Sequence, residues 1–335
     1  MANGVYLQSN ESEANRVIAF RRDAQGCLAE AQSVATGGRG DGTPHLTSQG
    51  SVVLSTDGSV VLVTNAASND VSVIAAGDLS LVDVAGTGGV TPKSVAEHDG
   101  LVYVVHAGDR SLTGFVLRDR RLVPLDGARR ELGEAADPAQ VAFAPDGRTL
   151  VVTDRGTDTI LVYPVGEDSR LGEATRVESA GPTPYGFAFA TDDTLVVTEA
   201  FGAAKGKAAA SSYRVNGNGA EPVSRSVGNG RSEICWAVTV GGKFVFTTNF
   251  ADGAVSRYVV GPSGELTLGD AAAGVAVDGR PGLRDEDVTA DGRFLYAIDA
   301  DGGRIFGWAI AEDGALEPLG SWNGLPATIA GLAAR

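Results

Sequence analysis

The sequence has 335 residues, of which 43% are hydrophobic but only 6% aromatic, and its 46 glycines are about twice the usual share of roughly 7%. Its net charge of −15 leaves no basic footprint, so nucleic acids and anionic membranes are not expected partners. No apolar run reaches the roughly 18 residues that cross a bilayer, and the N-terminus shows no charged and apolar leader. We therefore expect a cytoplasmic protein whose two cysteines, Cys27 and Cys235, are reduced.

The dominant feature of the sequence is a repeat. Residues 55–65 and 144–154 both contain an Asp-Gly turn, an apolar run and a polar end residue. Five more variants bring the total to seven, with a mean length of about 48 residues, and a fixed period of this size indicates a repeat architecture. The polar end residues, in chain order, are Asn10, Asn65, His106, Asp154, Glu199, Asn249 and Asp299.

Each repeat is expected to form four antiparallel strands. The chain opens at residues 5–8 with a strand of the second type, so the first repeat lacks an innermost strand. In later repeats an apolar strand passes through an Asp-Gly or Gly-Gly turn into a second one, such as 195–197. An alternating third strand, such as 70–74 or 304–308, precedes a more polar fourth, such as 265–268. This order favours burial near a hub and exposure at a rim.

These features predict an all-β fold, a seven-bladed β-propeller of four-stranded blades that occupies residues 1–335 as a single domain. Radial repetition leaves only short sheet edges. The tail at 328–332 offers an unpaired apolar strand, which we expect to pair with the N-terminal blade and close the ring. The alternatives, an open sandwich or two small barrels, fit a constant period poorly.

One mouth of the central channel is the expected functional site. In an antiparallel meander, the end of the second strand and the start of the innermost strand lie on the same face, so the seven polar end residues should surround this mouth. A pocket with a few convergent polar groups is the usual binding site. The innermost-strand openings expected beside them are Ser48-Gln49, Lys93, Gln140, Tyr185, Cys235-Trp236 and Asp285-Glu286.

Glu199 is the main candidate for a catalytic residue. Glutamate forms turns poorly, and a carboxylate close to Tyr185, Phe201 and Trp236 would have a raised pKa that suits a general base. His106 and Asp154 are the other catalytic candidates. Asn and Asp at strand ends commonly bond their own backbone in turns, so a structural role is favoured over a functional one for Asn10, Asn65, Asn249 and Asp299.

The substrate-binding candidates combine scarce positive groups with residues near the mouth. Cys235 has no histidine nearby in its repeat, and we interpret it as a packing residue. No nucleophile elbow, zinc pair or phosphate loop is found, so no cofactor and no metal are expected. The binding candidates are Arg155, Arg284, Tyr185, Phe201, Trp236, Asn249, Gln140, His45, Gln49, Glu286 and Asp299.

With its Pro-Asp-Gly turns and Val-Val-Thr-Asp/Glu strand ends, the whole chain resembles the lactonase family of seven-bladed propellers. That family includes 6-phosphogluconolactonases and 3-carboxymuconate lactonizing enzymes. The match is carried by residues 144–148 and 154–158 and by Gly181-Pro182 leading toward Glu199. The resemblance implies that the catalytic glutamate of the family falls on Glu199.

Two polar groups of the family are replaced in this sequence. The family motif Pro-His-x-His corresponds here to Asp137-Pro138-Ala139-Gln140, and the arginine that follows Gly-Pro is replaced by Thr183. His45 or His106 could supply the histidine from another blade, and Arg284 could supply the arginine. The sequence leaves these substitutions open.

The function expected from these observations is that of a lactonase-like enzyme that hydrolyses or forms a small cyclic ester. Glu199 would move the proton, and Arg155 or Arg284 would stabilise the oxyanion. Scarce cations favour a neutral or monocarboxylate lactone as the small-molecule substrate, and we expect a monomer or a weak homo-oligomer. The alternatives are a cycloisomerase acting on a small carboxylate and a non-catalytic propeller that binds a ligand or a protein. A Glu199 held in local backbone bonds would favour the binding propeller.

Overall fold

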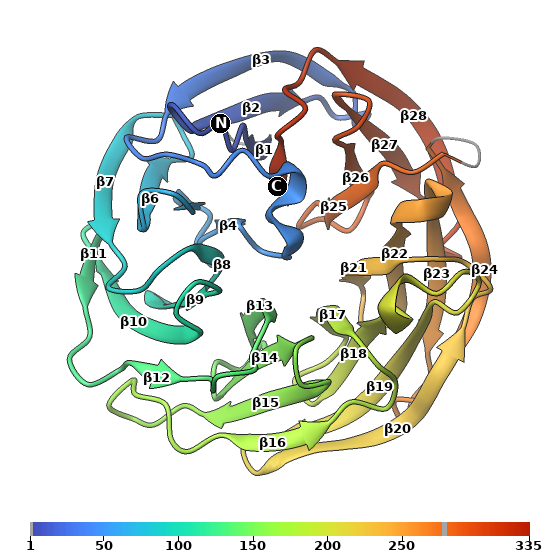
Figure 1. Ribbon diagram of the computed structural model, residues 1–335. Coiled ribbons are helices and arrows are strands. Elements are labelled where there is room, and N and C mark those ends of the chain that lie inside the picture. Colours follow the sequence, from blue (N-terminus) through green and yellow to red (C-terminus); the bar gives the residue numbers. More distant parts are fainter. Residues whose placement is uncertain (1–2, 277–279) are drawn as a thin grey trace.

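The repeats fold into sheets that stand like spokes around one axis (Figure 1). The computed structural model describes residues 3–276 and 280–335, and within them the strands form seven antiparallel sheets. We number the sheets as blades in chain order, blade 1 being β29-β1-β2-β3 and blade 7 being β25-β26-β27-β28. The predicted seven-bladed propeller is confirmed.

The strands occupy equivalent positions in every blade. The innermost strands are β29 (Ala330–Ala334), β4 (Val52–Leu54), β8 (Pro92–His98), β13 (Pro138–Phe143), β17 (Pro184–Phe189), β21 (Ile234–Val240) and β25 (Leu283–Val288). The second strands are β1 (Gly4–Gln8), β5 (Val60–Asn65), β9 (Leu101–His106), β14 (Thr149–Asp154), β18 (Thr194–Glu199), β22 (Phe244–Asn249) and β26 (Phe294–Asp299).

The third and fourth strands form the outer half of each blade. The third strands are β2 (Arg16–Arg22), β6 (Asp70–Ala75), β10 (Ser111–Arg118), β15 (Thr159–Pro164), β19 (Ala209–Asn216), β23 (Ala254–Val260) and β27 (Arg304–Ile310). The outermost are β3 (Leu28–Ala35), β7 (Leu81–Gly86), β11 (Arg121–Pro124), β12 (Arg130–Glu131), β16 (Thr175–Glu178), β20 (Gly219–Gly228), β24 (Leu266–Val275) and β28 (Leu316–Asn323). Single turns of 3-10 helix lie at η1 (Pro44–Thr47), η2 (Phe201–Ala203) and η3 (Phe250–Asp252).

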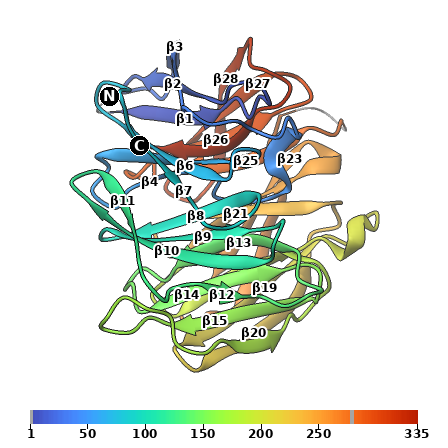
Figure 2. The ribbon, with the colours of Figure 1, turned by 60° about the vertical axis from the view of Figure 1, so that its left-hand side comes forward.

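The C-terminal strand closes the ring, as predicted. β29 pairs antiparallel with β1, with Val5 opposite Ala334 and Leu7 opposite Leu332. The two ends of the chain therefore lie close together in blade 1 (Figures 1 and 2). The missing innermost strand of the first repeat is supplied from the other end of the sequence.

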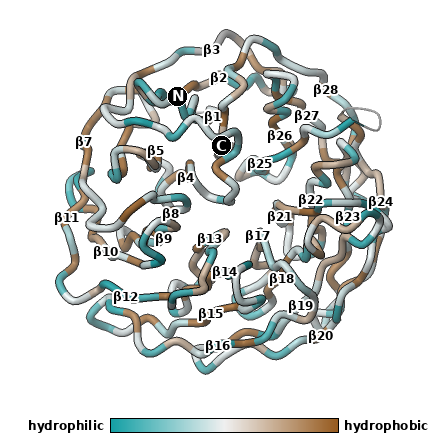
Figure 3. The backbone as a smooth tube through the Cα atoms, viewed as in Figure 1, coloured by the Kyte–Doolittle hydropathy of each residue, from teal (hydrophilic) through white to brown (hydrophobic). Residues whose placement is uncertain are grey.

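Burial follows the order of the strands. Every residue of β5, β14, β18, β22 and β26 is buried, whereas the outer strands β7 and β16 have no buried residue. The last two residues of β13, β17, β21 and β25 are only half-buried. Hydrophobic segments accordingly concentrate in the strands and hydrophilic ones in the loops (Figure 3).

Hydrophobic clusters lie between neighbouring blades and hold the ring together. Between blades 5 and 6, Val196 packs with Val245 and Tyr258, and between blades 6 and 7, Phe246 packs with Leu295. Burying each such side chain contributes about 1.5–3 kcal/mol.

No helix in residues 3–276 and 280–335 is long and apolar enough to cross a membrane.

Blade 3 departs from the four-stranded pattern. β11 pairs only with residues 115–118 of β10, and the short β12 pairs with Ser111 and Leu112 at the beginning of the same strand. Two short strands thus share the outermost position that one strand fills in the other blades.

The central loop, residues 43–50, crosses the channel near its mouth. It contains η1, whose residues His45, Leu46 and Thr47 have positive φ angles of 55°, 50° and 50°. Figure 1 shows this blue segment over the central opening. Its backbone bonds Ile329 of the closing segment through His45 and Ala139 of blade 4 through Gln49. The loop therefore ties together blades that are not neighbours.

The side chain of Gln49 links the central loop to blade 6. Its side chain donates to the carbonyl of Ala237 in blade 6 at 2.7 Å and accepts from the backbone N–H of the same residue at 3.1 Å. A Cβ added to Gly186 would lie 2.2 Å from Gln49 Oε1 and 2.4 Å from the Cys235 carbonyl, so only glycine fits there. The side chain of Gln49 therefore joins the central loop to blade 6.

Candidate functional site

The predicted polar residues do end the second strands, with one exception. β5, β9, β14, β18, β22 and β26 end at Asn65, His106, Asp154, Glu199, Asn249 and Asp299. β1 ends at Gln8, and Asn10 follows it at a φ of 51°. All seven side chains belong to buried residues. Their hydrogen-bond partners, however, lie in loops and in the third and fourth strands.

Asp154 shows the structural role of these positions. Its carboxylate accepts hydrogen bonds from the backbone N–H groups of Asp137 and Gly156 and from the Thr157 hydroxyl. Such bonds fix the loop after the strand and the opening of the innermost strand. Asn249 likewise fixes the loop after its strand, because its amide donates to the Ala254 carbonyl at the start of β23.

Glu199 is also held by local bonds. Oε1 accepts from the Gly181 N–H at 2.9 Å and from the Ser211 hydroxyl, and Oε2 accepts from the Ser226 hydroxyl at 2.7 Å. Burial raises the pKa of this carboxyl, and the hydrogen bonds partly oppose the rise. The side chain is fully buried and fastens β18 to the neighbouring strands, so its contacts favour a structural role over a general base.

His106 lies in a similar environment. Its Nδ1 contacts the Ser111 carbonyl at 3.2 Å, and Nε2 has no hydrogen-bond partner among the residues that the structure describes. Burial lowers its pKa to about 4, which leaves the ring neutral at physiological pH. The imidazole packs against Gly89 and does not line the mouth.

The expected lining of the mouth is therefore shifted by one residue, from the last residue of a second strand to the residue that follows it. Because successive side chains of a strand point to opposite sides, the residue after the strand end faces the axis. Arg155, Ala200 and Phe250 follow Asp154, Glu199 and Asn249, and they line the mouth. Asn10, Asn65 and Asp299 are equally absent from its lining, and Asp299 instead binds Gly302 N and Arg304 Nε.

The pocket at the mouth, which we call the mouth pocket, lies between the central loop and blades 4 to 7. Its volume is about 350 Å³. Five of the predicted binding residues meet here: His45, Tyr185, Trp236, Arg155 and Arg284. The remaining lining residues are Thr47, Thr183, Ala200, Gly202, Ala203, Glu233, Cys235 and Phe250.

Arg155 presents a largely buried guanidinium to the mouth pocket. Its side chain is 15% exposed, its Nη2 lies 2.9 Å from Asp137, and its Cζ lies 4.8 Å from the Tyr185 ring centroid. Its Nε has no hydrogen-bond partner within residues 3–276 and 280–335. This N–H is buried without a partner among those residues, so any contact of Arg155 with a bound molecule would be made by the rest of the guanidinium.

Arg284 supplies the second guanidinium, from blade 7. Its Nη2 lies 3.0 Å from Asp301, and its Cζ lies 4.2 Å from the ring centroid of Phe250. Burial lowers the pKa of Arg284, which remains far above neutrality for any arginine. Its Nε, like that of Arg155, lacks a partner among the described residues.

Aromatic rings form the walls of the mouth pocket. The Tyr185 and Trp236 centroids lie 5.5 Å apart, and His45 meets Trp236 edge-on, also at 5.5 Å. The indole N–H donates to the Ser48 carbonyl at 3.1 Å. This bond joins the wall of the pocket to the central loop.

His45 is held in one tautomer by the central loop. The backbone N–H of Thr47 donates to its Nδ1 at 3.1 Å, so a neutral ring carries its proton on Nε2. Lys93 donates to the Thr47 hydroxyl at 2.7 Å, and burial lowers the pKa of this lysine. Positive φ angles at three successive non-glycine residues cost energy, and such strain is concentrated at functional sites.

Sequence reasoning missed Glu233 and treated Cys235 as packing. Burial and the charge of Asp252 raise the pKa of Glu233, which immediately precedes β21 and has a φ of 55°. The Cys235 thiol donates to the Glu233 carbonyl, and burial raises its pKa well above the usual range. A protonated thiol is a poor nucleophile. A polar residue just before an innermost strand is the signal that identifies Glu233.

The other predicted binding residues lie elsewhere. Gln140 bonds both the N–H and the carbonyl of Phe187, and Gln49 crosses to Ala237 as described. Both glutamines and Glu286 border the channel below the central loop. Phe201 begins η2 and is not part of the lining of the mouth pocket.

Comparisons with known proteins agree with this architecture. Residues 117–201 match the family described as "Lactonase, 7-bladed beta-propeller". The resemblance to the lactonase family of seven-bladed propellers, which the sequence predicted, is therefore confirmed. No curated protein matches the sequence.

Solved propeller structures superpose over nearly the whole chain. The periplasmic gluconolactonase of Pseudomonas aeruginosa gives a TM-score of 0.76 at 17% identity, covering 99% of this chain and 98% of that one. A protein of Lactobacillus plantarum gives 0.77 at 14%, covering 99% of both chains. A candidate 6-phosphogluconolactonase of Bacteroides uniformis gives 0.74 at 18%, covering 98% of this chain and 99% of its own. At these identities the likeness establishes the fold.

Proposed function

We propose that the mouth pocket binds and hydrolyses a small cyclic ester. The observation that carries this proposal is the pair of guanidiniums, Arg155 and Arg284, which line one aromatic pocket with side chains that are only 15% and 9% exposed. Arginine donors in a site of low dielectric stabilise an oxyanion or hold a carboxylate. The family match and the gluconolactonase among the structural neighbours support a lactonase-like reaction.

Hydrolysis requires a nucleophilic water and a stabilised oxyanion. Water attacks the carbonyl carbon of the lactone, and the negative charge that develops on the carbonyl oxygen is stabilised by Arg155 and Arg284. The ring C–O bond then breaks, and the proton lost by the water reaches the leaving alkoxide to give a hydroxy acid. His45 and Glu233 line the pocket and can carry this proton, since a raised pKa suits Glu233 to general-base work.

The substrate class follows from the size and charge of the pocket. A volume of about 350 Å³ admits one small ring. Asp137 and Asp301 already pair with the two arginines, so the net positive charge left for a substrate is small. A neutral or monocarboxylate lactone fits this balance better than a phosphorylated one.

The test is a turnover assay of the purified protein with a panel of neutral, carboxylated and phosphorylated lactones. We expect the wild type to open a neutral or monocarboxylate lactone and Arg284→Met to lower kcat/KM by about 10²–10³-fold. Arg121→Gln is the control, because Arg121 lies on the rim with a 68% exposed side chain. Turnover equal in wild type and Arg284→Met would contradict the proposal.

The contacts of Glu199 favour a second candidate, a propeller that binds a small molecule without converting it. Both carboxylate oxygens of Glu199 accept local bonds, so the family residue expected to act as general base is occupied. In that case the same panel would bind at the mouth pocket, measured by calorimetry, and would be recovered unchanged. Loss of binding in Arg284→Met without any turnover in the wild type would support this candidate.

A further inference from the structure

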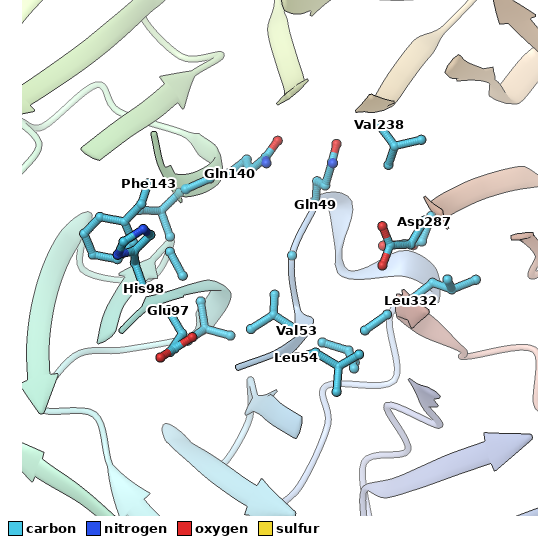
Figure 4. Close-up of a pocket in the computed structure, with 18 of the residues that line it drawn as sticks. Gln49, Val53, Leu54, Glu97, His98, Gln140, Phe143, Val238, Asp287 and Leu332 are labelled. Carbon is cyan, nitrogen blue, oxygen red and sulfur yellow. The ribbon is translucent and has the colours of Figure 1, made fainter. Parts of the chain in front are cut away.

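A second cavity lies on the other side of Gln49, where the innermost strands approach the turns between strands. We call it the turn-side cavity. Its volume is about 340 Å³, and it is bordered by β4, β8, β13, β21, β25 and β29 (Figure 4). His98 and Pro145, which belong to the turn side of blades 3 and 4, mark its outer edge. It shares no lining residue with the mouth pocket.

The titratable side chains that line the turn-side cavity are mostly carboxyl groups. Glu97, Asp285, Glu286 and Asp287 line it, whereas none of the described lining residues is a lysine or an arginine. His98 is the remaining titratable side chain, and its Nε2 lies 2.8 Å from the Pro145 carbonyl. A net acidic cavity is complementary to a cation.

Two of these carboxyl groups are deeply buried and incompletely bonded. Asp285 is 2% exposed and Glu286 is 3% exposed. Asp285 Oδ2 and Glu286 Oε2 have no hydrogen-bond partner among the residues that the structure describes. An unpartnered buried carboxyl costs free energy, so the fold retains these groups against a penalty.

Asp285 and Asp287 leave β25 on the side of the closing strand. Asp287 Oδ2 accepts from the Ala334 N–H at 2.8 Å, and the Gly331 backbone partly lowers the pKa of Asp285. Figure 4 shows the Asp287 carboxylate directed toward the opening, on the side opposite Glu97 and His98. The Glu97 carboxylate already accepts hydrogen bonds from the backbone N–H groups of Thr56 and Gly100 in the adjacent turns.

Apolar side chains complete the cavity. Val52, Val53, Val95, Val238 and Leu332 line it between the two acidic sides. The described part of the chain holds no group of three or more His, Cys, Asp or Glu arranged to hold a metal ion. Acidic groups beside aliphatic walls suit a cation with an apolar body.

We propose that the turn-side cavity binds a small organic cation, a primary ammonium with a short aliphatic chain. The ammonium would donate to Asp285 and Asp287, and the chain would pack against the valines. The inference does not depend on the reaction at the mouth pocket, since the two cavities share no lining residue.

Binding of a cation should release protons. Burial raises the pKa of Asp285 to about 8 and that of Asp287 to about 7, so at pH 7 Asp285 is mostly protonated and Asp287 is about half protonated. A nearby ammonium favours the ionised carboxylates. The titratable groups that line the cavity with them are Glu97 and His98 from β8 and Glu286 from β25, and the described lining residues of β4, β13, β21 and β29 carry no charge. Arg284 and Trp236, which line the mouth pocket, partly lower the pKa of Asp285.

The experiment is isothermal titration calorimetry of the full chain with n-butylammonium chloride and with 1-butanol. We expect saturable binding of butylammonium, at least tenfold weaker binding of the alcohol, and higher affinity at pH 9 than at pH 6. At pH 7, titration in two buffers of different ionisation enthalpy should show net proton release. Binding of both probes with equal affinity, no saturable binding of butylammonium, or no proton release would overturn the proposal.

Variants locate the site. Asp285→Asn and Asp287→Asn should each weaken butylammonium binding at least tenfold, whereas Glu312→Gln, which removes an exposed charge in blade 7, should leave it unchanged. Arg155→Met at the mouth should also leave it unchanged, which separates this proposal from the proposed function. If Asp285→Asn does not fold, Asp287→Asn and the proton count of the wild type decide. Binding unaffected by the Asp287 variant would overturn the proposal.

Discussion

The two ends of the central channel differ in charge although they are built from the same strands. At the mouth, Arg155 and Arg284 lie among aromatic rings, and at the turn side Asp285 and Asp287 lie among valines and a leucine. β25 contributes to both ends, since Arg284 lines one cavity and Asp287 the other. The chemistry of each end therefore depends on the position of a residue along an innermost strand, and the repeat supplies only the scaffold.

Among the residues that form the mouth end, truncation of Trp236 should have the largest effect on stability. This residue is 1% exposed, contacts Tyr185 and His45, and anchors the central loop through Ser48. We expect Trp236→Ala to lower the free energy of unfolding by about 3–5 kcal/mol, as truncation of buried aromatic residues does. Urea denaturation measures this change. Trp322→Ala, on the half-buried outer strand β28, is the control and should cost less.

Truncation of Gln49, which joins the central loop to blade 6, should destabilise the protein less than truncation of Trp236. Replacing it by alanine leaves the N–H and carbonyl of Ala237 without their side-chain partners. We expect a loss of about 1–3 kcal/mol in the free energy of unfolding. Gln25→Ala, at an exposed turn, should change it little. Equal stability of the two variants would show that the crossing side chain does not hold the blades together.

The buried carboxyl of Asp285 in the turn-side cavity should make the free energy of unfolding decrease as the pH rises. Because the pKa of Asp285 is raised from 3.8 to about 8 in the folded protein, the native state keeps a proton between pH 4 and pH 8 that the unfolded chain has lost. The free energy of unfolding therefore decreases as the pH rises through this range. Asp285→Asn should flatten this dependence and stabilise the protein at pH 8, measured by urea denaturation at several pH values. A steeper dependence in the variant would contradict the burial effect.

The smallest effect on activity is expected at Glu199, which lies outside both ends. Glu199→Gln should leave lactone turnover per folded molecule unchanged, because the side chain does not line the mouth pocket. It should lower the free energy of unfolding by about 1–3 kcal/mol, since an amide N–H₂ cannot accept the bonds that the carboxylate accepts. A 10²-fold loss of turnover in a folded variant would restore Glu199 as the general base.

The repeat made the fold and the strand ends predictable from the sequence. The polar residues that end β5, β14 and β22 were located to the residue, because the same pattern recurs along the chain. Periodicity does not reveal which side of a strand faces the axis, however, and a shift of one residue reverses the answer. For this reason Asp154 and Asn249 were predicted at the mouth, where the structure places Arg155 and Phe250.

The central loop shows what the repeat could not predict. His45 was a candidate, but Thr47 was not, and nothing in the pattern indicates that residues 43–50 cross the channel to Ala237 in blade 6. The loop occurs once, so no other repeat provides a comparison. Its left-handed residues follow from contacts distant in sequence, as with His45 N–H and the Ile329 carbonyl.

The most direct test of the difference between the two ends is a crystal structure of the protein soaked with the hydroxy acid that lactone opening produces. We predict density in the mouth pocket, with the carboxylate at Arg155 and Arg284 and the carbon chain against Tyr185 and Trp236. Density for the acid beside Glu199 or in the turn-side cavity, with the mouth pocket vacant, would contradict the assignment of the reaction to the cationic end.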